Sequence, residues 1–135
     1  MKPLVPHGPG FAFLDSFAIT APGKSGEGKK WLDPQLPFFA DHFPGEPLMP
    51  AVLLVECAAQ AAGALWGSIQ DTGQPVRFSL AQIVQFKVQQ PVLPGQTVRT
   101  EVTLDHSLGK LVQFSATLSV DGQEVARGRI VLSAP

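Results

Sequence analysis

A histidine and a glutamate stand fourteen positions apart in the most informative segment of the chain, His42 to Gln60. Imidazole and carboxyl groups are the side chains that most often accept and donate protons in enzyme reactions. Prolines at positions 44, 47 and 50 separate the two residues, and the positions after the last proline are apolar up to Glu56. We therefore predict an active site for acid–base chemistry that includes the start of a helix.

Glu56 is hard to explain as a structural residue, because the positions around it in a helix are apolar. A carboxyl group is almost never fully buried without a partner. Gln60 lies one helical turn later on the same face and can supply a hydrogen bond. Two alternatives remain open at this point. Glu56 can reach solvent at a helix edge, or only contact Gln60, and His42 can fill a core position among its neighbouring phenylalanines.

The elements that must position these residues follow from the prolines and from the apolar pattern. A helix is expected from about 51 to 70, directly after Pro50, a residue that suits a helix start. It is apolar on nearly every side, so we expect it to be buried. Residues 34–50 contain five prolines and cannot form a regular helix. We expect residues 44–50 to form an extended, stiff connector.

The remaining segments predict a sheet. Residues 21–30 contain three glycines and a proline and are expected to form a turn or a flexible hairpin. Asp121-Gly122 is a strong hairpin signal. The sequence thus indicates a single α+β domain over residues 1–135, with an antiparallel sheet wrapped around one long helix. Strands are expected over 11–20, 78–88, 96–104, 111–120 and 124–132, with a short one beginning at 31–32 and the last three forming a meander.

Composition limits the function classes. With 44% hydrophobic and 16% charged residues, the chain suits a compact soluble protein that buries part of its surface in an oligomer. A net charge of −1 with scattered basic residues argues against nucleic acid. Glu56 and Gln60 interrupt the longest apolar run, so we expect no membrane span. The single cysteine, Cys57, excludes an internal disulfide and favours the cytoplasm. We find no metal-ligand cluster and no phosphate-binding loop, and expect neither a metal nor a cofactor.

The string HFPGEPLMPAVLLVECAAQ resembles the signature of the β-hydroxyacyl-[acyl carrier protein] dehydratases, which have the hot-dog fold. In that family a histidine before Phe-Pro is followed fourteen residues later by an acid on the central helix, which matches His42 and Glu56. Weaker resemblance extends to both ends of the chain, including Pro6-His7 and Phe86-Lys87. Despite its match we interpret His7 as a structural residue.

The resemblance implies a lyase that dehydrates a 3-hydroxyacyl thioester, carried on acyl carrier protein or CoA, to the trans-2-enoyl thioester in fatty-acid or polyketide-type synthesis. His42 would take the α-proton, and Glu56 would protonate the departing β-hydroxyl group. Ala51, through its N–H at the helix start, and Gln60 would bind the substrate. The family builds each site from two subunits, so the resemblance implies a homodimer and leaves assembly above the dimer open.

Two departures from the family pattern leave the acyl chain and its carrier open. Ala51 and Asp41 stand where the family usually has glycine. Two other functions also remain open, a hot-dog thioesterase and a catalytically silent acyl-binding or scaffold subunit. A thioesterase that uses only the helix carboxylate has no need of His42. The presence of both His42 and Glu56 argues against a silent subunit.

Overall fold

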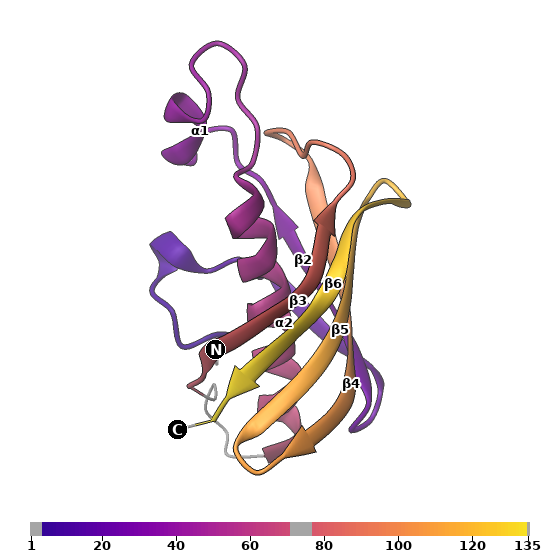
Figure 1. Cartoon of the computed structure of the whole chain (residues 1–135). Helices are drawn as coiled ribbons and strands as arrows, with labels where there is room; N and C mark the ends of the chain where they lie inside the picture. The colour runs from indigo at the N-terminus through magenta and orange to yellow at the C-terminus, as the bar shows by residue number, and fades with distance from the viewer. Residues whose placement is uncertain (1–3, 71–76, 135) are drawn as a thin grey trace.

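The computed structural model describes residues 4–70 and 77–134, which form one long helix wrapped by a curved antiparallel sheet (Figure 1). This arrangement confirms the predicted α+β class. Within the described residues the strand order is β1-β2-β4-β5-β6-β3, and neighbouring strands run antiparallel. The elements are η1 (Pro9–Phe11), β1 (Ser16–Ala21), β2 (Ser25–Trp31), α1 (Phe38–Asp41), α2 (Ala51–Gln70), β3 (Ser79–Val88), β4 (Thr97–Leu108), β5 (Leu111–Val120) and β6 (Gln123–Ser133).

Helix α2 has the predicted bounds and forms the centre of the core. Its middle turns are rich in alanine, and Ala58 and Ala61 are fully buried, which lets the sheet approach closely. Burial ends at the two termini, where Val52 is 72% and Ile69 37% exposed. The expectation of burial along the whole helix is therefore wrong for its first and last turns. By length and composition alone α2 is apolar enough to cross a membrane, contrary to our expectation, but it is packed here as a core helix.

The largest difference from the sequence prediction is β2, which occupies most of the glycine-rich segment expected to be a turn or a flexible hairpin. The segment does form the hairpin of β1 and β2, but the second strand ends at Trp31 instead of beginning there. It pairs with both β1 and β4. Gly28 is buried on this strand, and a side chain there would collide with Leu14 and meet Ala61 of α2. The glycine is needed for close packing of strand on helix rather than for a change of direction. The turn itself contains Gly23, whose φ of +70° favours glycine.

The other strands lie close to their predicted positions, and the meander of β4, β5 and β6 is confirmed. Asp121 and Gly122 have φ values of 52° and 79°, as a hairpin turn of type I′ requires. The first strand is shorter than expected, because Pro9–Phe11 forms a 3-10 turn and β1 starts only at Ser16.

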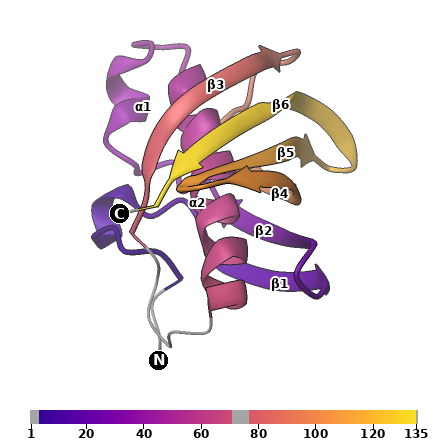
Figure 2. The same ribbon diagram turned by 60° about the horizontal axis from the view of Figure 1, so that its bottom comes forward.

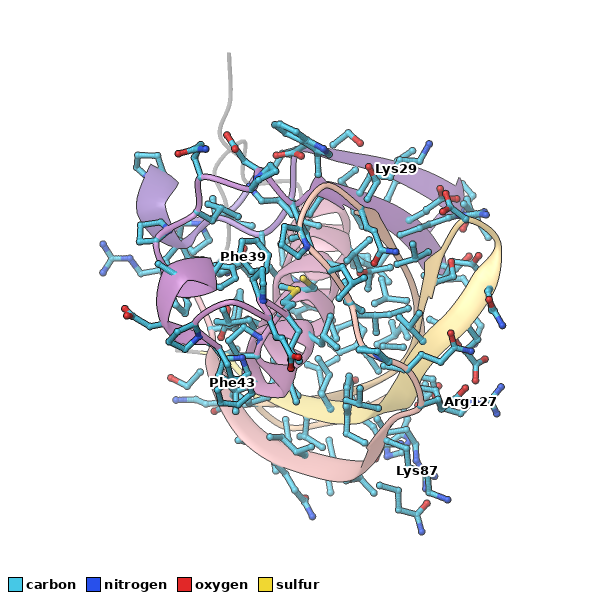
Figure 3. All side chains as sticks on the ribbon, turned by 90° about the horizontal axis from the view of Figure 1, so that it is seen from above. Lys29, Phe39, Phe43, Lys87 and Arg127 are labelled. Atoms are coloured by element: carbon cyan, nitrogen blue, oxygen red, sulfur yellow. The ribbon has the colours of Figure 1, made fainter. Side chains whose placement is uncertain are left out.

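The sheet has two free edges in the described chain, β1 and β3 (Figure 2). Charged side chains such as Lys29, Lys87 and Arg127 extend away from α2 (Figure 3). Edge strand β3 carries several exposed apolar side chains, among them Ile83 at 49% and Val88 at 44% exposed, and edge strand β1 carries Ile19 at 40%. Helix α1 and the turn after it lie beyond the N-terminal end of α2 (Figure 1).

Candidate active site

His42 stands at the end of α1, in a segment where the prolines predicted no regular helix. The helix has only four residues and starts directly after Pro37, a position at which a missing N–H costs nothing. The backbone N–H of His42 donates to the carbonyl of Phe38 at 3.0 Å. The short helix thus fixes the backbone of His42 from the N-terminal side.

A tight turn fixes His42 from the C-terminal side, where we expected an extended connector. Phe43 and Glu46 exchange backbone hydrogen bonds of 3.2 and 3.0 Å around Pro44-Gly45, and Leu48 N–H donates to the His42 carbonyl at 2.8 Å. Gly45 has a φ of +78°, which favours glycine. Residues 43–46 therefore form a closed turn because a glycine follows the proline, and the prediction of a stiff extended connector is wrong there.

The imidazole of His42 is oriented by the same turn. Its Nδ1 lies 3.1 Å from the carbonyl oxygen of Leu48. A carbonyl oxygen can only accept a hydrogen bond, so this contact places the proton on Nδ1 and leaves the lone pair of Nε2 free to act as a base. The ring stacks on Phe43 with centroids 4.2 Å apart. Asp41 is exposed and forms no ion pair with His42 among the described residues.

Gln60 fixes the position of the Glu56 carboxyl group, as the spacing of the two residues predicted. Gln60 is fully buried. Its Oε1 accepts from Phe13 N–H at 2.6 Å, and its Nε2 donates to the Phe11 carbonyl at 2.9 Å and to Glu56 Oε2 at 2.8 Å. The two backbone groups allow only one orientation of the amide, so Gln60 can only donate to Glu56. Its predicted role in substrate binding stays a prediction, and these contacts add a positioning role.

His7 lies beside the same carboxyl group, which the sequence analysis did not anticipate. Its Nε2 is 3.9 Å from Glu56 Oε2, with the two side chains 25% and 23% exposed. Its ring packs against Phe11 and Phe78, with centroids 5.9 and 5.8 Å away. The residues are far apart in sequence, and the match of Pro6-His7 to the family's opening segment was the signal that pointed to this position.

The start of α2 supplies the backbone groups predicted for Ala51. Leu53 N–H donates to the carbonyl of Pro50 at 3.0 Å. The N–H groups of Ala51 and Val52 precede this bond, and helix geometry leaves them without helical acceptors. As a residue, Ala51 is exposed in the single chain.

A single chain does not bring the two proposed catalytic groups into contact. Among the described residues no ion pair of 4.0 Å or less joins His42 to Glu56. The side-chain contacts of His42 are with Leu48 and Phe43, whereas those of Glu56 are with Gln60 and His7. We call residues 42–48 the base half-site, and Glu56, Gln60 and His7 the acid half-site.

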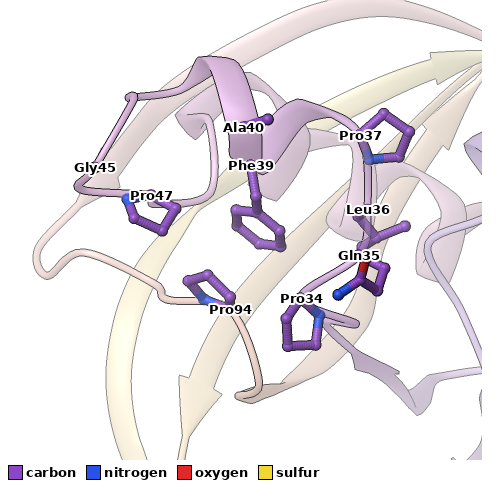
Figure 4. A pocket seen from close by; sticks show the side chains of 9 residues that line it. All are labelled: Pro34, Gln35, Leu36, Pro37, Phe39, Ala40, Gly45, Pro47 and Pro94. Carbon is purple, nitrogen blue, oxygen red and sulfur yellow. The ribbon is translucent and has the colours of Figure 1, made fainter.

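Two other features lie near the half-sites. Burial raises the pKa of the Cys57 thiol to about 12, with a further contribution from the charge of Glu56, so this thiol stays protonated at neutral pH. A groove of about 390 Å³ adjoins the base half-site (Figure 4). Neither His42 nor Glu56 lines it. Its walls are Pro34, Gln35, Leu36, Pro37, Phe39, Ala40, Gly45, Pro47 and Pro94. In the described part of the chain, no cluster of three or more histidine, cysteine or acidic residues is arranged to hold a metal ion.

Known proteins resemble this chain over most of its length. The family model ApeI-like, described as ApeI dehydratase, matches residues 18–129. The 3-hydroxyacyl-[acyl-carrier-protein] dehydratase FabZ of Herpetosiphon aurantiacus is 35% identical, over 96% of this chain and 92% of its own. The corresponding enzyme of Dechloromonas aromatica is 33% identical, over 94% and 90%.

Solved structures confirm the hot-dog fold. The dehydratase heterocomplex ApeI:P from Xenorhabdus doucetiae superposes with a TM-score of 0.81 at 17% identity, over 98% of this chain and 88% of that one. A hypothetical thioesterase protein from Streptococcus pneumoniae with coenzyme A gives a TM-score of 0.67 at 8% identity, over 91% and 88%. At these identities the structures show the fold alone, and a thioesterase neighbour does not distinguish between the two activities.

Proposed function

Since the chain belongs to the ApeI-like dehydratase family, its reaction is the dehydration of a 3-hydroxyacyl thioester, and we propose that His42 and Glu56 carry it out. The observation that supports this assignment is the orientation of the two groups. The Leu48 carbonyl leaves His42 Nε2 as a free base, and Gln60 holds Glu56 through one oxygen. One group is thereby prepared to accept a proton and the other to donate one.

His42 is the base for the α-carbon of the substrate. Its Nε2 takes the α-proton, and the electrons of the broken C–H bond form the new C=C bond as the β-hydroxyl group leaves. The hydrogen bond to Leu48 stabilises the imidazolium that forms, because its Nδ1–H then faces the carbonyl oxygen with a charged donor. General base assistance of this kind contributes about 10²–10⁴-fold to a rate.

Glu56 is the acid for the β-hydroxyl group, and the Gln60 contact defines which oxygen holds the proton. Oε2 accepts the N–H of Gln60 at 2.8 Å. In the protonated acid Oε2 is therefore the carbonyl oxygen, and the proton lies on Oε1. Transfer of this proton releases the hydroxyl group as water and leaves a carboxylate that still accepts the Gln60 hydrogen bond.

The N–H of Ala51 is proposed to bind the thioester oxygen, which gains negative charge as the α-proton leaves. The start of a helix suits this role, because unpaired N–H groups and the helix dipole both favour negative charge. The methyl group of Ala51 does not remove the donor. In other enzymes the loss of one such donor costs about 3–4 kcal/mol of transition-state stabilisation.

We propose that a second copy of the chain completes each site. The two half-sites do not meet within one chain, and apolar side chains are exposed near both of them. Val52, one helical turn before Glu56, is 72% exposed, and Phe43 of the base half-site is 53% exposed. Edge strand β3 adds a row of exposed apolar residues and an unpaired backbone edge, which commonly pairs with another chain. His42 of one subunit then faces Glu56 of the other.

The proposed carrier of the acyl chain is acyl carrier protein, with CoA as the alternative, and the proposed location is the cytoplasm. The support for the carrier is the similarity to FabZ proteins, whose names specify acyl-carrier-protein substrates. One similar structure is a heterocomplex, so assembly with a different chain is the alternative to a homodimer. Sedimentation velocity of the purified protein distinguishes the two, because a homodimer forms without a further component.

Product analysis tests the reaction directly. The purified protein is incubated with a 3-hydroxyacyl thioester on acyl carrier protein and, separately, on CoA, and the products are identified by mass spectrometry. Formation of the trans-2-enoyl thioester with loss of water is the expected result. Free acid with free thiol would instead indicate a thioesterase. Unchanged substrate with a folded protein would indicate a silent subunit.

A further inference from the structure

We propose that His7 is a positioning residue for the Glu56 carboxyl group and, with Gln60, stabilises the carboxylate that remains after proton donation. The proposal deepens the proposed function, because it concerns the acid of the same site. His7 belongs to the segment before η1 and approaches Glu56 from outside α2. Its Nε2 and the Nε2 of Gln60 approach the same oxygen, Oε2, at 3.9 and 2.8 Å.

The surroundings of His7 define its protonation state. Its Nδ1 is buried and has no hydrogen-bond partner among the described residues, and its ring packs against Phe11 and Phe78. A buried N–H group without an acceptor is rarer and more costly than a bare nitrogen. The proton therefore belongs on Nε2, which faces Glu56. A proton on Nδ1 would instead be a buried N–H without an acceptor among the described residues.

An N–H donor on Oε2 has two consequences for Glu56. Hydrogen bonds to the charged form of a carboxyl group favour that form, so a donor from His7 stabilises the carboxylate that remains after proton transfer. Both donors occupy Oε2, which leaves Oε1 as the oxygen that delivers the proton to substrate. At 3.9 Å the His7 contact is longer than a hydrogen bond in the chain without substrate. It shortens as negative charge develops on the carboxylate.

The other titratable groups around Glu56 do not replace His7. The thiol of the adjacent Cys57 is fully buried and stays neutral. Two other charged groups influence this thiol electrostatically, Lys30 of β2 and Asp15 just before β1, and they pair with each other at 3.4 Å. In the proposed dimer, His42 of the partner subunit faces Glu56 across the substrate. Of the titratable groups named here, His7 is thus the one whose side chain lies beside the Glu56 carboxyl group within the same subunit.

The test compares three variants with the wild type in the dehydration assay over a range of pH. His7→Phe keeps a ring between Phe11 and Phe78 but has no N–H donor, whereas His7→Gln keeps a donor near the position of Nε2. Phe78→Leu changes the packing around the ring and leaves the donor in place. We expect kcat of His7→Phe to fall about tenfold, and the fall of kcat/KM at high pH to move up by about one pH unit, because the ionised acid has lost a donor.

Both controls report on the assignment. We expect the fall of kcat/KM at low pH, which reflects His42, to be unchanged in His7→Phe, and we expect His7→Gln and Phe78→Leu to keep the wild-type profile at high pH. If His7→Phe does not fold, His7→Leu replaces it with the same expectation. A folded His7→Phe or His7→Leu protein with the wild-type pH profile overturns the proposal.

A second measurement separates this proposal from the proposed function. The carboxyl ¹³C resonance of Glu56 is followed by NMR against pH in the wild type and in the His7 variants, with Glu56→Gln used to assign it. A titration midpoint that rises in the variant without a donor supports the role of His7, and an unchanged midpoint contradicts it. If the midpoint of Glu56 differs in this way between wild type and variant but the wild type yields no enoyl thioester, the proposed function is disproved and the contact between His7 and Glu56 is not.

Discussion

The turn that carries His42 and the helical turn that carries Glu56 are held by different kinds of bond. The base half-site is closed by backbone hydrogen bonds within residues 42–48, and its stacking residue Phe43 is 53% exposed. The acid half-site depends on a fully buried amide, Gln60, which makes three hydrogen bonds, two to the backbone of Phe11 and Phe13 and one to Glu56 on the same helix.

This difference indicates which half-site is complete in one chain. The acid already has its orienting donors inside the subunit that carries it. The base has its tautomer defined, but its outer surface is exposed and apolar. A site assembled between subunits therefore combines a rigid acid with a base whose surroundings are completed by the partner.

The largest effects are expected when either reacting group is removed. His42→Ala and Glu56→Gln should each lower kcat by about 10²–10⁴-fold, because general acid–base assistance is lost in each. Steady-state kinetics give the rates, and sedimentation velocity checks that each variant keeps the assembly state of the wild type. A near-normal rate in either variant would show that the residue is not catalytic.

Gln60→Leu should weaken the acid half-site and the fold together. The Phe13 N–H and the Phe11 carbonyl would lose their partner, and a buried unpaired group costs about 1–3 kcal/mol. We expect the free energy of unfolding in urea to fall by this amount. Glu56→Gln is the matched control, since it keeps a polar side chain beside Gln60 and should change stability little. Equal stability of the two variants would argue against the positioning role of Gln60.

Gly45→Ala should strain the base half-site with a smaller cost in stability. Gly45 has a φ of +78°, and an alanine in that conformation costs roughly 1–2 kcal/mol. We expect a lower thermal midpoint and a reduced kcat, because the turn sets the position of the His42 ring. Gly10→Ala is the control, since a side chain there meets open space and the φ of Gly10 is not positive. The same midpoint in both variants would contradict the importance of this turn.

Replacement of Cys57 should have the smallest effect on stability at neutral pH, and its effect at high pH tests the burial of the thiol on α2. Burial raises the pKa of this thiol from 9.0 to about 12 in the folded protein. The unfolded chain therefore loses its thiol proton first, and this contribution to stability is complete below about pH 9 and is lost as pH rises toward 12. Cys57→Ala should lose less stability than the wild type over that range. The chain has no tyrosine to add to this signal. Parallel curves would contradict the burial of the thiol.

The sequence predicted the elements whose signals are local. The bounds of α2 follow from Pro50 and the apolar run, and the Asp121-Gly122 turn follows from its dipeptide. The role of the glycines in β2 was not predictable from the local sequence. Gly28 is required because a side chain at that position would collide with Leu14 and meet α2, which lie elsewhere in the sequence. The turn at Pro44-Gly45 was missed because the proline spacing was given more weight than the glycine.

Within the site, the Glu56–Gln60 contact was predictable because helical spacing places the two residues on one face. The fixed orientation of the Gln60 amide was not, since it depends on backbone groups of Phe11 and Phe13. The approach of His7 to Glu56 also depends on the tertiary path of the N-terminal segment. Long-range contacts of this kind have no periodic signature in a sequence.

Mixing two inactive variants tests most directly whether one site takes its base and its acid from different subunits. His42→Ala and Glu56→Gln proteins are unfolded together, refolded and assayed, with each variant refolded alone as the control. A mixed dimer has one site with both groups intact, so random pairing should restore about a quarter of the wild-type rate. Recovery at this level supports the two-subunit site. No recovery, with mixed dimers shown by native mass spectrometry, would contradict it.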